Sequence, residues 1–545
     1  AVAGCTGIKS STGNVVSSET ETNAEETSAQ SEAGTFSSAD MFTERDLAGT
    51  YEESGAVYVT LSDDGIAGET DGVVIDGQMV TITAEGTYIF SGTLSEGQIV
   101  VDADNAKVQI VFDNVDITCA SSAAVYVKSA EKVFVTLAEG SQNTLRNTDE
   151  YVAIDDNNID AVIFAKSDLT LNGTGSLTII SAEGHGIVSK DDLKIIGGTY
   201  DITAAGHALS GKDSVRIADG TFILTAEKDG IHAENADDEE KGYIYIADGD
   251  FTITSDGDGM DASNIVQIED GTLDITAGGG SANSLKTHES DVPGGPGGGM
   301  PQNGEKLDGE SMPQMGEKPH GENMPQDTTT DESGTSTKGI KAGGGMYLNG
   351  GTYQIDSADD SIHSNANITI ADGTYTLATG DDGVHADDAL IVNGGTITVT
   401  ESYEGLEGLT VTINDGTIDI TASDDGINTA GEKMELNGGY IHILAGGDGV
   451  DSNGDLTING GEIYIDGPSD NGNSAIDYGD RSSAYVNGGT LVAIGSSGMA
   501  EGMSDSSKQK VLMVKLGEQM EAGNVVLTDS EGNVIVSYTA LKTYY

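Results

Sequence analysis

Acidic residues recur at a fixed spacing through the second half of the chain, beside an apolar residue in each copy. Carboxylates at this density repel one another, and some take up protons unless a cation lies among them. Ca²⁺ binds about six to eight oxygen ligands, including carboxylates and turn carbonyls. The spacing therefore predicts at least one bound Ca²⁺ in this column, whose members include Asp359, Asp360, Asp381, Asp382, Asp424, Asp425, Asp448 and Asp451.

A second interpretation of the same residues stays open. Asp and Gly are common turn residues, because the Asp side chain bonds to the nearby backbone, and each carboxylate taken singly fits that role. Lys338 and Glu404 also interrupt the predicted column. His232, His363 and His385 occupy equivalent positions, and His185 and His207 form a similar pair. Since no cysteine accompanies them, a stacked structural ladder is favoured over a zinc site.

The elements that position these residues are short strands in a repeat of about 22 residues. A turn ending in glycine recurs, for example at Gly351, Gly373 and Gly395, and an apolar marker at Ile340, Ile362 and Val384 keeps the same phase. Fixed periods of this size indicate a solenoid. Apolar and polar residues alternate on both sides of each turn, so the elements are strands. The sequence predicts an all-β, single-stranded parallel β-helix.

The repeat divides the chain. Residues 51–159 are expected to form an N-terminal cap and irregular coils, and residues 160–507 the regular β-helix. One step between turns, from Gly271 to Gly351, is 80 residues long, so one coil carries an insertion rich in Gly, Met and Pro near residues 281–337. Such a composition cannot bury a core, and we expect a disordered loop. Residues 508–545 are predicted to form a C-terminal β cap, with strands at Val511–Lys515 and Val534–Tyr538.

The N-terminal residues indicate a location. Residues 1–5 end in Gly4 and Cys5 and look like the remnant of a bacterial lipoprotein signal, in which Cys5 would carry the lipid. Residues 6–50 are rich in Ser, Thr and Glu, as expected of a disordered tether. We therefore expect an extracellular protein that is anchored to the bacterial cell surface by lipid alone. Cys119 has no partner and is expected to be a small core residue.

Charge limits the partners. The chain has 91 Asp and Glu against 24 Lys and Arg, a net charge of -67. Such a surface repels phosphate backbones and anionic lipids, which argues against nucleic acid and direct membrane-surface partners. Uncharged glycans favour aromatic platforms. The absence of tryptophan weakens that route, and an ordinary strand position is the favoured interpretation of each tyrosine. If exposed, the tyrosines that could contribute a platform are Tyr403, Tyr440, Tyr464, Tyr478 and Tyr485.

The segment Gly86–Gly92, the later Gly-Gly-Thr and Asp-Asp-Gly coils and the insertion before Lys338 resemble a family of bacterial cell-surface proteins described as carbohydrate-binding domain-containing proteins. The resemblance covers residues 50–500. It implies a right-handed parallel β-helix like that of pectate lyases, bound calcium, and binding of polygalacturonate and plant cell-wall glycans. The eight aspartates named above match the calcium-bearing turns of that family.

These observations favour a non-catalytic binder of an acidic, polygalacturonate-like polysaccharide. Pectate-lyase-like chemistry is the alternative. Pectate lyases share this fold and use calcium together with a basic residue that removes a proton beside a carboxylate. The chain has four arginines, of which Arg481 has several aspartates nearby in sequence. A calcium-stabilised structural or adhesive rod is the third reading, since fold alone does not decide function.

Overall fold

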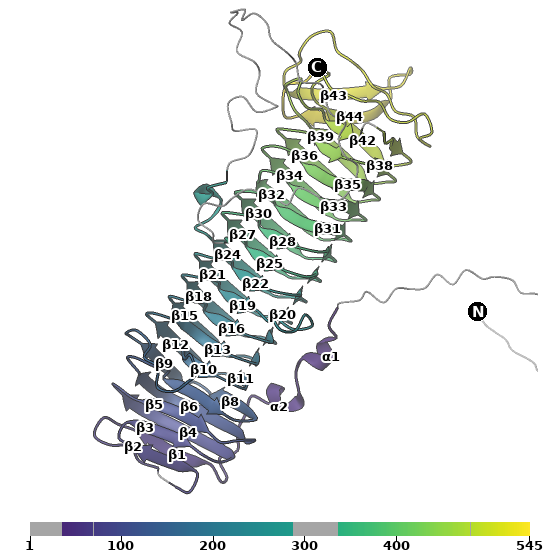
Figure 1. Cartoon of the computed structure of the whole chain (residues 1–545). Helices are drawn as coiled ribbons and strands as arrows, with labels where there is room; N and C mark the ends of the chain where they lie inside the picture. Colours follow the sequence, from purple (N-terminus) through teal and green to yellow (C-terminus); the bar gives the residue numbers. More distant parts are fainter. Residues whose placement is uncertain (1–34, 69, 287–335, 480) are drawn as a thin grey trace, which may run out of the picture. The chain divides into compact units, whose positions relative to one another are not determined.

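The computed structural model describes residues 35–68, 70–286, 336–479 and 481–545. Residues 36–545 form one compact unit in which the chain winds into stacked coils (Figure 1). Almost every strand pairs in parallel with the equivalent strands one coil before and one coil after it. This arrangement confirms the predicted all-β parallel β-helix. No helix in the described ranges is long and apolar enough to cross a bilayer.

The strands form three parallel sheets that run along the coils. The first sheet carries the apolar markers and consists of β3 (Met79–Ile82), β5 (Gln98–Asp102), β7 (Val125–Ser129), β10 (Ala161–Ala165), β13 (His185–Ser189), β16 (Leu209–Gly211), β19 (Ile231–Ala233), β22 (Met260–Ala262), β25 (Ile340–Ala342), β28 (Ile362–Ser364), β37 (Val450–Ser452), β40 (Ile476–Tyr478) and the first halves of β31 (Val384–Val392), β33 (Leu406–Ile413) and β35 (Ile427–Leu436).

The second sheet follows in each coil. It contains β1 (Val57–Leu61), β4 (Gly86–Leu94), β6 (Lys107–Thr118), β8 (Lys132–Leu137), β11 (Asp168–Gly173), β14 (Asp192–Ile195), β17 (Ser214–Ile217), β20 (Tyr243–Ile246), β23 (Val266–Ile268), β26 (Met346–Leu348), β29 (Ile368–Ile370), the second halves of β31, β33 and β35, and then β38 (Asp455–Ile458) and β41 (Ala484–Val486).

The third sheet lies after the glycine turn. It begins with the ends of β4 and β6 and continues through β9 (Gln142–Asn147), β12 (Ser176–Ser181), β15 (Thr199–Ala204), β18 (Thr221–Ala226), β21 (Asp250–Ser255), β24 (Thr272–Ala277), β27 (Thr352–Ser357), β30 (Thr374–Thr379), β32 (Thr396–Glu401), β34 (Thr417–Ala422), β36 (Tyr440–Ala445), β39 (Glu462–Asp466) and β42 (Thr490–Ile494).

The glycine turns explain why the repeat is so regular. All of the turn glycines that mark the sequence repeat, from Gly198 to Gly489, have a positive φ, between +83° and +143°. Residues with a Cβ rarely adopt this left-handed region, so glycine is required where each coil bends into the third sheet. A Cβ on Gly439 would also lie 2.6 Å from the carbonyl oxygen of Gly416 in the coil before.

The core is a one-dimensional stack of inward side chains. In the third sheet, inward and outward residues alternate, as in β34, where Ile418 and Ile420 are buried. Rings stack along the axis: the centroid of Phe222 lies 5.2 Å from that of Tyr200 and 4.7 Å from that of Phe251. Each coil buries its apolar residues mainly against its two neighbours. Cys119 is buried and free, as expected from the sequence.

The segment before the first coil departs from the predicted tether. Helices α1 (Ser38–Met41) and α2 (Glu44–Leu47) lie in residues 36–50, which pack along the second sheet (Figure 1). We call residues 36–50 the N-terminal arm. Asp46 is fully buried, and its carboxylate lies 2.6 Å from the Lys132 ammonium and accepts the Thr170 hydroxyl. A tether can therefore extend only as far as about residue 35.

Both ends of the arm are held. The Phe36 ring lies 4.3 Å from the Tyr243 ring, and the Gln267 side chain exchanges two hydrogen bonds with the Phe36 backbone. A few apolar residues in a polar stretch are enough to dock, because they cover exposed rings of the second sheet. Aromatic pairing of this kind contributes about 0.5–1.5 kcal/mol beyond burial.

Three smaller elements complete the unit. Strand β2 (Val73–Asp76) forms an antiparallel hairpin with β3, and the 3₁₀ turn η1 (Ser281–Asn283) opens the insertion. The C-terminal cap is an antiparallel hairpin of β43 (Gly523–Thr528) and β44 (Val534–Ala540). The strand predicted at 511–515 is absent, since Val511–Val514 are exposed with no pairing partner. The disorder predicted for residues 281–337 falls mostly on residues 287–335, outside the described part.

Candidate cation site in an acidic column

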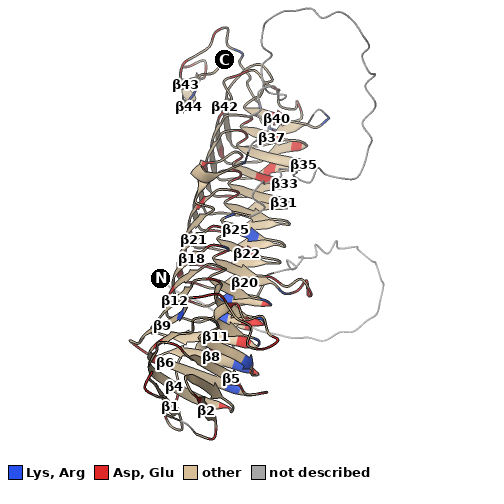
Figure 2. Cartoon of the chain, turned by 60° about the vertical axis from the view of Figure 1, so that its left-hand side comes forward, with Lys and Arg blue, Asp and Glu red and all other residues tan. Residues whose placement is uncertain are grey.

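The register places the acidic residues in one column beside the first sheet. Met260 pairs with Ile340 across the insertion, Ile340 with Ile362, and Ile362 with Val384. The pairing continues through Leu406, Ile427 and Val450 to Ile476. Carboxylates near each marker therefore lie one strand spacing apart, about 4.8 Å. We call these residues the acidic column; the ribbon is coloured red for Asp and Glu near β33 and β35 in Figure 2.

Lysines pair with the carboxylates of the column from β22, where Lys341 lies 3.3 Å from Asp261, to the coils at β28 and β31. The Lys338 ammonium lies 2.8 Å from a carboxylate oxygen of Asp359 and 2.8 Å from one of Asp360. The Lys286 ammonium lies 2.7 Å from Asp359 and also contacts Asp381. Burial would raise the pKa of Asp360, but Lys338 and His363 hold that pKa well below its usual range. Ammonium groups thus take the place predicted for calcium at Asp359, Asp360 and Asp381.

In the next coil a histidine pairs with the carboxylates. The His385 Nδ1 atom lies 3.0 Å from Asp382 and 3.2 Å from Glu407. Burial would lower the pKa of His385, but hydrogen bonds to Asp382 and Asp387 raise it to about 12, so the ring is cationic. Burial next to Asp382 raises the pKa of Glu407 to about 8. Asp382 is therefore paired within the protein.

At β35 and β37 the acidic column consists of carboxylates that lie close to one another. Ligand oxygens of Asp425, Asp448 and Asp451 all lie within 4.8 Å of one another, and Asp424 is next to them in sequence. Within the described ranges, none of these four aspartates forms an ion pair with Lys, Arg or His. Burial and neighbouring carboxylates raise the pKa values of Asp425, Asp448 and Asp451 to about 8, 7 and 6. We call Asp424, Asp425, Asp448 and Asp451 the upper acidic cluster.

Backbone geometry holds the upper acidic cluster together. The Asp425 carboxylate accepts the backbone N–H of Asp448 at 2.6 Å, and the Asp448 carboxylate accepts the N–H of Ser474. A Cβ on Gly447 would collide with the carboxylates of both Asp424 and Asp425, so glycine makes room for them. Converging carboxylate oxygens are the kind of ligand that Ca²⁺ requires. The residues fit calcium here and do not fit it beside Lys286 and Lys338.

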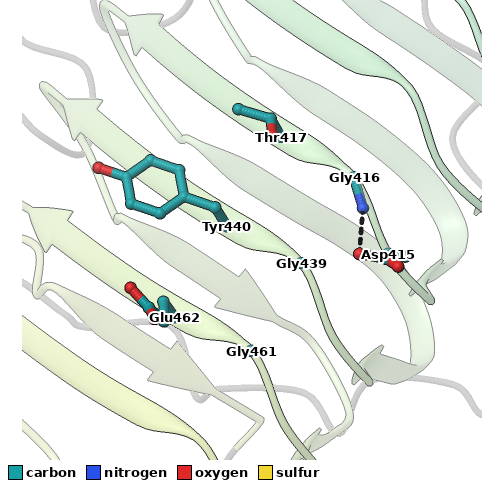
Figure 3. Close-up of a pocket in the computed structure, with 7 residues that line it drawn as sticks. All are labelled: Asp415, Gly416, Thr417, Gly439, Tyr440, Gly461 and Glu462. Atoms are coloured by element: carbon teal, nitrogen blue, oxygen red, sulfur yellow. Dashed lines mark hydrogen bonds between the residues drawn. The ribbon is translucent and has the colours of Figure 1, made fainter.

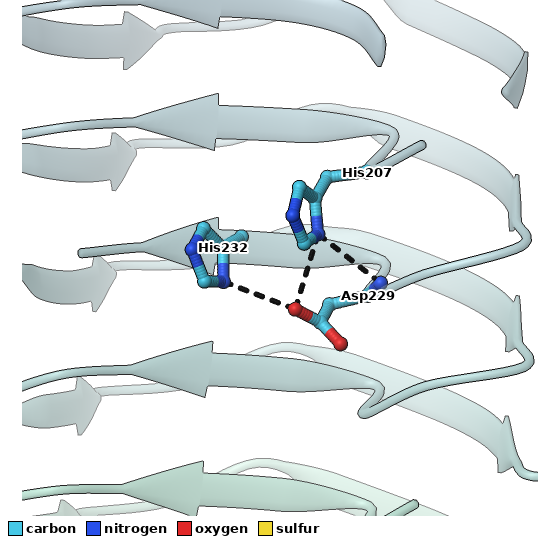
Figure 4. Close-up of side chains that lie close together, drawn as sticks. All are labelled: His207, Asp229 and His232. Carbon is cyan, nitrogen blue, oxygen red and sulfur yellow. Dashed lines mark hydrogen bonds and ion pairs between the residues drawn. The ribbon is translucent and has the colours of Figure 1, made fainter. Parts of the chain in front are cut away.

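The histidines of the coils before Met260 form a stack. The His207 ring lies 4.8 Å from His185 and 4.1 Å from His232, with interplanar angles of 3° and 10°. Asp229 lies 3.1 Å from His207 and 3.0 Å from His232 (Figure 4). His207 Nδ1 also accepts the backbone N–H of Asp229, which engages its lone pair. His185 and His207 stack as the sequence predicts, whereas His232, which the sequence groups with His363 and His385, stacks on His207 instead.

The other histidine pair differs from the predicted ladder. His363 and His385 lie 5.0 Å apart but are tilted by 58°, because each ring turns toward the aspartate of its own coil. Lys286 is the site residue that sequence reasoning missed, since it stands inside the predicted disordered insertion. Cys5, the predicted lipid anchor, lies outside the described residues.

Comparisons with known proteins give the class. A family model for carbohydrate-binding domain-containing proteins matches residues 76–383 and 381–509, so the chain belongs to this family. A carbohydrate-binding domain-containing protein from Acetivibrio thermocellus is 40% identical over 139 residues, which are 25% of this chain. The chain spans about half the length of that relative (49%). The solved structure of the polysaccharide lyase-like protein from C. thermocellum, a gadolinium derivative, is 36% identical over 41% of this chain and 92% of that chain, with a TM-score of 0.40.

Proposed function

We propose that this protein is a non-catalytic binder of an acidic, polygalacturonate-like polysaccharide, which it holds through Ca²⁺ bound at the upper acidic cluster. The observation that carries the proposal is the convergence of Asp425, Asp448 and Asp451 without an ion-pair partner among the described residues. Membership of a carbohydrate-binding family supplies the ligand class.

The charge of the protein explains why an ion is needed. A chain of net charge -67 repels a polyuronate. A calcium ion that takes ligands from both partners reverses the sign of this interaction, because Ca²⁺ retains positions for further oxygens when a few carboxylates bind it. The coils beside Lys286 and Lys338 do not need the ion, so the proposed site is confined to the coils from β35 onward.

The basic residues in the column argue against lyase chemistry. A lyase needs a base that is unprotonated near neutral pH, because this base accepts a proton from the substrate. Burial would lower the pKa values of Lys286 and Lys338, but the surrounding aspartates raise them above the usual value, so both stay protonated. Arg481, the candidate arginine, is exposed. Lys286 and Lys338 act as fixed counter-charges.

The test is polygalacturonate binding with calcium and with excess chelator, while absorbance at 235 nm is followed in the same samples. We expect binding that chelation abolishes, with flat absorbance. Asp425→Asn combined with Asp451→Asn should remove it, whereas Asp201→Asn, which removes an exposed charge on β15, should not. Rising absorbance would instead identify a lyase, and equal binding in chelator would exclude the calcium bridge.

A further inference from the structure

A second surface of different chemistry lies on the third sheet, on strands separate from the acidic column. A shallow cavity of about 610 Å³ opens over β34, β36 and β39 (Figure 3). Its floor is formed by Gly416, Gly439 and Gly461 at the glycine turns, and Tyr440 rises beside it. We infer that this surface is a calcium-independent binding site for an uncharged polysaccharide. The inference rests on the proposed carbohydrate-binding function and gives it a second ligand class.

The aromatic side chains provide the first argument. Tyr440 is 42% exposed, although most large rings of the solenoid are buried. Its centroid lies 5.7 Å from that of Tyr464 on the next coil, and Tyr464 stacks on Tyr538 at 5.1 Å with an interplanar angle of 13°. A row of rings with one exposed end presents apolar faces and phenolic hydroxyls together, as sugar rings with C–H and O–H groups require.

The row is fixed before any ligand arrives. The Tyr538 hydroxyl donates to the buried carboxylate of Asp466 and lies 3.2 Å from His442 Nε2. The C-terminal hairpin therefore holds one end of the row against the third sheet. Side chains that are already ordered lose less entropy on binding, which favours affinity.

The floor of the shallow cavity, which forms a groove along the glycine turns, is as rigid as the row of rings. A ladder of asparagine amides joins the turns, with hydrogen bonds of 2.8 Å from Asn414 to Asn393, 2.9 Å from Asn437 to Asn414 and 2.8 Å from Asn459 to Asn437. The glycines between the ladder and the strands have no side chains, so the surface stays open over three coils. An extended chain can lie across such a surface along the solenoid.

Charge decides which polysaccharide fits. The polar residues around the groove include Asp415 and Glu462, and none of the described residues that line it is a lysine, arginine or histidine. These carboxylates accept hydrogen bonds from hydroxyl groups but repel a uronate. They also lie two coils apart, with the Tyr440 coil between them, whereas the carboxylates of the upper acidic cluster converge from adjacent coils. The groove therefore selects a hydroxyl-rich, uncharged chain.

The experiment measures binding of the full chain to soluble uncharged xyloglucan in excess chelator. Tyr440→Ala is expected to weaken binding about tenfold, since it removes the exposed stacking ring. Tyr440→Phe should keep most of the affinity, which separates stacking from a hydrogen bond of the hydroxyl. Tyr58→Ala is the matched control, because Tyr58 is 56% exposed on β1 at the other end of the solenoid.

The experiments can contradict the uncharged-polysaccharide site without contradicting the calcium-dependent site, and the reverse. Absence of xyloglucan binding, or an equal loss with Tyr440→Ala and Tyr58→Ala, would overturn this inference. Neither result touches calcium-dependent binding of polygalacturonate, which is measured with the same variants. Conversely, Asp425→Asn with Asp451→Asn should leave xyloglucan binding unchanged, and loss of both ligands in that variant would contradict two independent sites.

Discussion

The Lys286 ammonium lies 2.7 Å from an Asp359 carboxylate oxygen, although Lys286 precedes the 287–335 segment and Asp359 follows it. The same ammonium contacts Asp381 in the next coil, and Lys338 completes the set from the other side of the insertion. Two lysines that flank the insertion thus serve as counter-ions for two buried carboxylates, Asp360 and Asp381, and for the partly buried Asp359. The acidic column is therefore divided into coils with built-in cations and coils without them.

Removal of one built-in cation tests this division. Lys338→Met should lower the free energy of unfolding by about 3–5 kcal/mol in chelator, because it leaves Asp360 buried without its ammonium. Calcium should restore part of the loss, since the variant creates the carboxylate site that the lysine fills. Denaturant unfolding with and without calcium measures both effects. Lys212→Met, which breaks an exposed pair with Asp237, should change nothing measurable.

The upper acidic cluster should make stability depend on pH when calcium is absent. The folded pKa values of Asp425, Asp448 and Asp451, about 8, 7 and 6, are raised above the usual aspartate value, so the folded state binds more protons than the unfolded state. Stability in chelator should therefore be highest below about pH 4 to 5 for these groups and fall as pH rises to about 8. Thermal unfolding across this range should show the decline, and saturating calcium should abolish it. A rise with pH in chelator would contradict the assignment.

Asp46 should control the N-terminal arm. Burial alone would raise the pKa of Asp46, but Lys132 and Thr43 lower it to about 2, so its contribution is present above pH 4 and disappears as pH falls through about 2. Asp46→Asn removes that charge at neutral pH. We expect trypsin to cleave after Arg45 at least tenfold faster in the variant, because the arm must open to fit the protease. Glu44→Gln, next to Arg45 but without the Lys132 pair, should cleave at the parent rate.

The ring stack in the core should dominate stability of the central coils. Phe222→Ala leaves a cavity between Tyr200 and Phe251, and we expect a loss of about 3–5 kcal/mol. Phe222→Leu should lose clearly less, since it refills most of the volume. Ile223→Ala is the matched control, because the adjacent side chain on the same strand points outward and is 48% exposed. Equal losses for positions 222 and 223 would mean that the alternation in β18 is wrong.

The sequence predicts those parts of the molecule that repeat. The marker residues pair as expected even across the insertion, where Met260 meets Ile340, because each coil has to match its neighbours residue by residue. The turn glycines are equally readable, since only glycine tolerates the positive φ that recurs at Gly373 and Gly395.

The features that the sequence did not predict depend on single contacts that do not repeat from coil to coil. Lys286 enters the acidic column from a segment whose composition indicates no structure. The N-terminal arm docks through isolated side chains such as Phe36 and Asp46, with no periodicity to reveal them. His363 and His385 follow the repeat in position but not in ring orientation, because local ion pairs to Asp360 and Asp382 outweigh stacking.

The N-terminal arm also gives the protein a mechanical order of events. It meets Gln267 first and Lys132 last, so it runs against the direction in which the coils are wound. A tensile force applied ahead of Phe36 would reach the Phe36 contacts, then the Met41 and Phe42 packing against Tyr245, and only then the Asp46 ion pair. The contacts would break in succession and release slack at each step. The arm would thus detach stepwise and dissipate the applied force before the first coil unwinds.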